Sequence, residues 1–102
     1  MKFYKKLYIG DTIKKPRRVK WKLKHNAGQL NIFVLTLAEG NDQLEIYHCA
    51  FLQQAYYKKN PPYVIGIANG YEEAVAIVCK ITEETLLATG GANLKEYLFS
   101  KR

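Results

Sequence analysis

The sequence predicts one small α/β domain with about three to four strands and with helices packed on the sheet. The chain has 102 residues, of which 48% are hydrophobic and 25% charged, the balance of an ordinary globular domain. From residue 30 onwards, short apolar runs alternate with longer segments of helical periodicity. We therefore expect 1–102 to be a single domain, in which a basic segment, 1–29, precedes a βαβα unit and a short C-terminal helix over 30–102.

The first strand of the unit is expected at Leu30–Leu37 (LNIFVLTL), an almost wholly apolar run that suits a strand buried on both faces. A helix over residues 43–59 should follow, because Asp42 and Glu45 have the spacing of a capping box. Apolar residues then recur at three- and four-residue steps, which is typical of one helix face. These residues are Leu44, Tyr47, Phe51 and Ala55.

The second strand is expected at Tyr63–Ala68 (YVIGIA), with a helix over residues 71–88 after it. Asn69 and Glu72 repeat the capping-box spacing, and the Gly90-Gly91 pair should end the helix. A short last helix over residues 94–100 (LKEYLFS) completes the chain. Because strand, helix and strand follow one another, we expect the two strands to be parallel with a right-handed crossover.

The first thirty residues allow two interpretations. Residues 7–13 suit a strand interrupted at Gly10, and residues 18–25 alternate between apolar and cationic side chains, which favours an edge strand. The rival interpretation of the second stretch is a short helix that opens at Pro16, a residue well suited to a first helical position. In that helix Trp21 would point away from the apolar face.

The positive charge lies at one end of the chain. Residues 1–25 contain ten basic residues against one acidic residue, Asp11, a local net charge of +9. Residues 26–102 contain six basic and eight acidic residues, a net charge of −2. The net charge of +7 therefore belongs to the N-terminal segment.

Clustered cations that neutralise phosphates indicate a nucleic-acid-binding surface. Aromatic residues are interleaved with the cations (Phe3, Tyr4, Tyr8 and Trp21), and exposed aromatic rings can stack on bases. The alternative is that lysines protect an exposed strand edge and that the aromatic rings belong to the core. The candidate nucleic-acid or anion contacts are Lys14, Lys15, Arg17, Arg18, Lys20, Lys22 and Lys24.

No other motif predicts chemistry. The Gly66–Gly70 stretch resembles a phosphate-binding turn only in its glycines, and Glu72 and Glu73 in the next helical turn would repel a phosphate. His48 and Cys49 are adjacent, but neighbouring residues on a helix point about 100° apart. We expect no cofactor, no metal site and no catalytic residue.

The cysteines and the termini indicate the setting. Cys49 and Cys79 lie in apolar surroundings without metal-ligand spacing, so both are expected to be small buried residues. The first ten residues lack the apolar stretch of a signal peptide, and no apolar run is long enough to span a membrane. We expect a cytoplasmic protein that does not contact a membrane.

Three stretches carry a resemblance: NIFVLTLAEGNDQLEIYHCAFLQQAYYKK, YVIGIANGYEEAVAIV and TGGANLKEYL. They resemble short uncharacterised bacterial proteins of unknown function, over about residues 30–98. The resemblance implies a βαβα arrangement and implies no activity. The basic N-terminal segment lies outside it.

Three function classes follow from the sequence. The first is a small non-enzymatic interaction or accessory protein, acting with a protein partner or as a homodimer, because no catalytic chemistry is visible. The alternative is a nucleic-acid-binding module that uses the basic segment. The third, an enzyme, would need a concave pocket that gathers His48 or Cys49 with polar partners from other elements.

Overall fold

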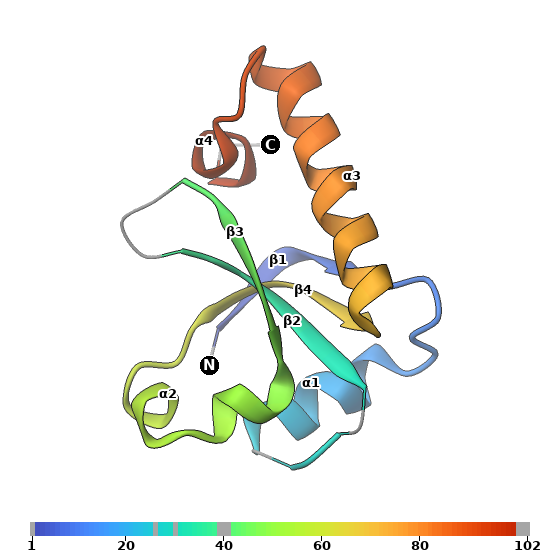
Figure 1. The fold of residues 1–102 in the computed structure, drawn as a ribbon, viewed down its shortest axis with the longest axis vertical. Coiled ribbons are helices and arrows are strands. Elements are labelled where there is room, and N and C mark those ends of the chain that lie inside the picture. Colours follow the sequence, from blue (N-terminus) through green and yellow to red (C-terminus); the bar gives the residue numbers. More distant parts are fainter. Residues whose placement is uncertain (1, 26, 30, 39–41, 100–102) are drawn as a thin grey trace.

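The computed structural model describes residues 2–25, 27–29, 31–38 and 42–99. The chain begins with a strand and a helix, continues with a β-hairpin and two short helices, and ends with a central strand followed by two further helices (Figure 1). In chain order the elements are β1 (Lys2–Ile9), α1 (Pro16–Lys24), β2 (Ile32–Leu37), β3 (Leu44–His48), the 3-10 helix η1 (Cys49–Gln53), α2 (Ala55–Lys59), β4 (Tyr63–Asn69), α3 (Tyr71–Thr89) and α4 (Leu94–Phe99).

The four strands form one mixed sheet in the order β1-β4-β2-β3. β1 and β4 are parallel, whereas β2 runs antiparallel to both β3 and β4. Because β4 and β2 are central, their side chains are the most deeply buried, and Val34, Leu35 and Ile65 are fully inaccessible to solvent. The predicted α/β class and strand number are confirmed.

Helices cover both faces of the sheet (Figure 1). Alternating side chains of β2 point to opposite faces, as the period of a strand requires. Leu35 packs with Ile77 and Ile81 of α3 on one face. Val34 packs with Leu23 of α1 on the other. The domain therefore has three layers, and α1 belongs to the layer opposite α3.

The predicted helix over residues 43–59 is wrong, because the segment forms β3, η1 and α2. The start of this segment fits both the helical and the strand period. In the structure it is a strand: Leu44 and Ile46 pack against the α3 core, while Tyr47 packs on the opposite face of the sheet. Hydrogen bonding to β2 therefore selects the strand. The expected capping box is absent, and Asp42 Oδ1 instead accepts a hydrogen bond from the Lys95 amide at 2.8 Å, at the start of α4.

The expected parallel crossover between the strands at residues 30–37 and 63–68 is also wrong, since β2 and β4 are antiparallel. The unpredicted strand β3 reverses the chain after β2. As a result β3 and β4 run in the same direction, with β2 between them, and η1 and α2 form the connection.

The favoured edge strand at residues 18–25 is wrong, and the rival interpretation is confirmed: Pro16–Lys24 form α1, with proline in the first turn. A helix places Val19 and Leu23 on the same inward face. Trp21, which the alternation had grouped with these apolar residues, does not share this face and is 57% exposed. The strand expected at residues 7–13 lies earlier, at Lys2–Ile9.

The later elements of the chain are largely as predicted, but the capping box expected at Asn69 and Glu72 is wrong. Gly70 precedes α3 without a side-chain cap, and Glu73 rather than Glu72 accepts a hydrogen bond from the Asn69 amide. The strand at residues 63–68 is β4, the helix at residues 71–88 is α3, and Gly90 ends α3 in the left-handed conformation with φ of 76°. Cys49 is buried as expected, but Cys79 is exposed on α3. Within the described ranges, no helix is long and apolar enough to cross a membrane.

Candidate nucleic-acid interface

Helix α1 is held on the sheet by a small apolar face. Leu23 is buried among Val34 and Cys49, and Val19 and Ile13 pack beside it. Lys22 and Lys24 stand in the last turn, where cations complement the partial negative charge of the helix end. The rest of the helix surface faces solvent and carries the predicted contact residues.

All seven predicted cations lie in or just before α1. Lys14 and Lys15 occupy the turn that precedes the helix, and the other five lie on it. Lys14, Lys15, Arg17, Arg18 and Lys24 are exposed, whereas Lys20 and Lys22 are half-buried. At about 100° per residue, Arg18 and Lys22 point to one side of the helix and Arg17, Lys20 and Lys24 to the other. The structure therefore divides the cations into two rows.

One row borders a groove of about 470 Å³. Lys14, Lys15, Arg18 and Lys22 contribute to its lining, together with three uncharged polar side chains. These polar residues are Thr12, Gln29 and Asn69. Among the described lining residues none is acidic and four are cationic, so the α1 side of the groove attracts anions. The carboxylate of Glu73 lies against the other side, where it accepts hydrogen bonds from Thr12 and Asn69.

The other row is partly fixed by an aromatic ring of β1. The ammonium groups of Lys20 and Lys24 lie 5.2 Å and 5.6 Å from the centre of the Phe3 ring. A cation over an aromatic face is attracted to the electron-rich ring. Phe3 therefore positions two charges instead of stacking on a base.

An aromatic pair lies between the two rows. Trp21 and His25 are one helical turn apart, and their rings stack with centres 4.3 Å apart and an interplanar angle of 23°. His25 Nδ1 lies 2.8 Å from the Trp21 carbonyl oxygen. Because a carbonyl only accepts hydrogen bonds, Nδ1 carries the proton in this contact. The stack is thus fixed at the outermost part of the helix.

We call the side chains of Arg17, Arg18, Trp21, Lys22, Lys24 and His25 the α1 surface. His25 is not among the contact residues predicted from the sequence, so its part in this surface was missed. The four-residue spacing between Trp21 and His25 was the available signal once the segment is helical. Two other candidate aromatics belong elsewhere: Tyr4 is only 8% exposed, and the Tyr8 hydroxyl donates to Glu84 at 2.6 Å.

Glu73 connects the basic segment to the start of α3. Its Oε2 accepts from the amide and hydroxyl of Thr12, at 3.2 Å and 2.6 Å, and its Oε1 accepts from the Asn69 amide at 2.8 Å. Burial acts to raise the pKa of this carboxyl, but the three hydrogen bonds favour the charged form more strongly, so the pKa is lowered. The predicted repulsion of phosphate from the Gly66–Gly70 turn is consistent with this geometry, because the Glu73 carboxylate already accepts a hydrogen bond from the Asn69 amide of that turn.

The other candidate groups do not form a catalytic pair. His48 Nδ1 accepts from the Ala50 amide at 3.0 Å, and the Cys49 thiol donates to the Gln29 carbonyl at 3.3 Å. Burial raises the pKa of the Cys49 thiol, although backbone hydrogen bonds act in the opposite direction. A buried thiol that favours its protonated form is a poor nucleophile. Among the described residues, no three His, Cys, Asp or Glu side chains gather as metal ligands would.

The geometry of the α1 surface defines a basic helix face with an exposed aromatic stack. Comparisons with protein-family models, curated proteins and solved structures find no match to this chain.

Proposed function

We propose that the protein binds single-stranded nucleic acid through the α1 surface. The observation that carries this proposal is the exposed Trp21–His25 stack with cations on both sides. Single strands present unstacked bases beside a regular array of phosphates, and proteins bind them with aromatic platforms in positively charged grooves. Trp21 would stack on a base, while Arg18 and Lys22 would contact phosphates along the groove.

The location of the charge can be tested separately from its amount. We would measure fluorescence anisotropy of labelled single-stranded DNA and RNA, and of a duplex of equal length, at several salt concentrations. The test variant is Arg17→Gln/Arg18→Gln/Lys22→Gln. The control, Lys58→Gln/Lys59→Gln/Lys80→Gln, removes the same charge from exposed positions on α2 and α3.

The test variant should bind more weakly, and its plot of log affinity against log salt should be shallower. Each lost phosphate contact lowers the slope by about 0.7 for a single strand, so three lost contacts lower it by roughly 2. The control should retain most of the affinity and the slope. Equal losses in the two variants would show that only net charge matters and would overturn the proposal.

A second candidate function is contact with another protein, including a second copy of the chain. The observation that favours it is the end of α3, where Leu87 is 87% exposed and the adjacent Leu86 is 56% exposed. Exposed apolar side chains that lie together often mark interaction sites. Sedimentation equilibrium across a range of concentrations should show a dimer that Leu87→Gln weakens; a monomer at every concentration would remove the homodimer.

A further inference from the structure

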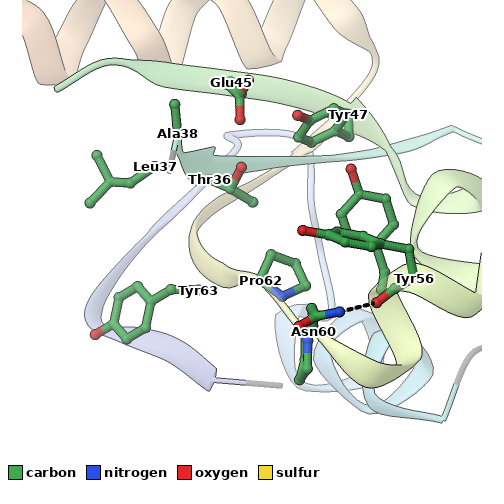
Figure 2. A pocket seen from close by; sticks show the side chains of 11 residues that line it. Thr36, Leu37, Ala38, Glu45, Tyr47, Tyr56, Asn60, Pro62 and Tyr63 are labelled. Atoms are coloured by element: carbon green, nitrogen blue, oxygen red, sulfur yellow. Dashed lines mark hydrogen bonds between the residues drawn. The ribbon is translucent and has the colours of Figure 1, made fainter. Parts of the chain in front are cut away.

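A second hollow lies on the same sheet face as α1, at the opposite end of β2. It is a cavity of about 560 Å³ between the ends of β2 and β3 and the α2–β4 connection. Figure 2 shows Glu45 and Tyr47 on β3 at one side of this space, with Tyr56, Asn60 and Pro62 at the other. The volume falls in the usual range for small-ligand sites.

Four tyrosines contribute to the walls of this cavity: Tyr47, Tyr56, Tyr57 and Tyr63. Tyr56 and Tyr57 meet at a near right angle, with ring centres 5.1 Å apart and an interplanar angle of 87°. Tyr47 adjoins Tyr57, with ring centres 6.1 Å apart. Asn60 Nδ2 donates to the Tyr56 carbonyl at 3.1 Å and closes the end of α2, so the wall is held by its backbone. Three rings in contact with one another, at different orientations, thus line one space.

The charge of the cavity is opposite to that of the protein. Glu45 is the charged residue among the described lining side chains, in a chain of net charge +7. Glu45 is the register partner of Thr36 and lies two residues from Tyr47, so the strand places all three on the cavity side. Burial, followed by the neighbouring Glu45 carboxylate, raises the pKa of Tyr47 to about 12. The tyrosine therefore stays neutral beside the carboxylate.

From this geometry we propose that the cavity binds a methylated ammonium group, with the tyrosine rings around the cation and Glu45 as its counter-charge. A cation without N–H donors gains little from neutral polar groups but is attracted to aromatic faces, which makes tyrosine-rich sites selective for it. The cavity exceeds the size of the ammonium group alone, so the remainder of the ligand would lie along Thr36 and Pro62. This site is separate from the α1 surface, and neither proposal depends on the other.

Two sources supply this chemistry, and the experiment separates them. Isothermal titration calorimetry would be run with choline and with a short peptide that carries trimethyllysine. Each has a neutral or unmethylated control: 3,3-dimethylbutan-1-ol, which replaces the choline nitrogen by carbon, and the same peptide with unmodified lysine. Tighter binding of choline identifies a free small molecule, and tighter binding of the methylated peptide identifies a protein partner.

Substitutions in the cavity distinguish binding by the tyrosine rings from non-specific binding. Tyr56 is 57% exposed, so Tyr56→Ala should fold normally, which circular dichroism checks. This variant should weaken binding by roughly 2- to 30-fold, whereas Tyr56→Phe, which keeps the ring, should retain the affinity. Glu45→Gln should also weaken binding, and Tyr71→Ala, an exposed tyrosine on α3, should not.

Binding of a methylated ammonium that exceeds binding of its control, and that follows this order of variants, supports the site. The proposal is overturned if choline and the methylated peptide both fail to bind at millimolar concentration. Equal binding of choline and its neutral carbon analogue would overturn it as well, because the positive charge would then play no part.

Discussion

Replacement of Trp21 by alanine should weaken binding of single-stranded nucleic acid while the fold persists. Removing an aromatic residue that stacks on a base costs about 1–3 kcal/mol, which corresponds to roughly 5- to 150-fold in affinity. The residue lies between two rows of cations that remain in place. The loss should therefore appear as weaker affinity with an unchanged dependence on salt.

The cost to folding can be worked from the exposure of the side chain. Trp21 is 57% exposed, so about two fifths of its surface is buried. Full burial of a tryptophan covers up to about 250 Å², so two fifths is about 100 Å², and at about 25 cal/mol per Å² the variant loses at most about 2.5 kcal/mol. The higher helix propensity of alanine returns up to about 0.7 kcal/mol. A domain of ordinary stability, about 5–15 kcal/mol, stays folded after such a loss.

The assay is anisotropy with a labelled single-stranded oligonucleotide, with unfolding in urea as the check on stability. Trp21→Phe should recover most of the affinity because it keeps a ring, and Tyr71→Ala, which removes an equally exposed aromatic residue from α3, should have no effect. Full affinity in Trp21→Ala would refute the stacking argument, even if the cations proved essential.

Two further predictions concern how α1 is held. Leu23 is on the buried face of α1 and is 4% exposed, so Leu23→Ala should lower the free energy of unfolding by about 2–5 kcal/mol. Nucleic-acid binding should weaken as well, because α1 is then held less firmly on the sheet. A loss of less than about 1 kcal/mol in urea unfolding would contradict the anchoring role. The Glu73 carboxyl has a lowered pKa in the folded protein, so its stabilising contribution is present above the ordinary glutamate pKa, 4.5, and is lost as pH falls through the lower folded value. Comparing urea unfolding of the wild type and Glu73→Gln between pH 3 and 7 should therefore show a difference that shrinks in acid, and a difference independent of pH would rule out this role.

The second half of the chain could be predicted where a single period dominates. β4 is a continuous apolar run at the sheet centre, and α3 ends at a glycine with positive φ, so neither has a competing interpretation. The prediction for residues 43–59 was wrong because two periods fit its start: Leu44 and Tyr47 suit a helical face, while Leu44 and Ile46 suit a strand face. Pairing with β2 selects the strand, and the local sequence pattern does not encode that pairing.

The candidate site shows a similar division. The positions of the seven cations in one segment followed from charge alone, but their division into two rows needed the helix. Alternation over residues 18–25 predicted a strand because it placed Trp21 with the apolar residues. In the structure the tryptophan is exposed and stacked on His25, which local sequence pattern does not encode. The cavity lined by tyrosines likewise lies between β3 and α2, which the sequence analysis had predicted as parts of one helix.

The central claim is that bases stack on Trp21, and this chain offers a direct measurement because Trp21 is its single tryptophan. Fluorescence excited at a wavelength selective for tryptophan would be followed while unlabelled single-stranded oligonucleotide is added. We predict quenching that saturates with the same dissociation constant as the anisotropy titration. Binding that leaves the tryptophan emission unchanged would contradict the account and place the contact elsewhere on the protein.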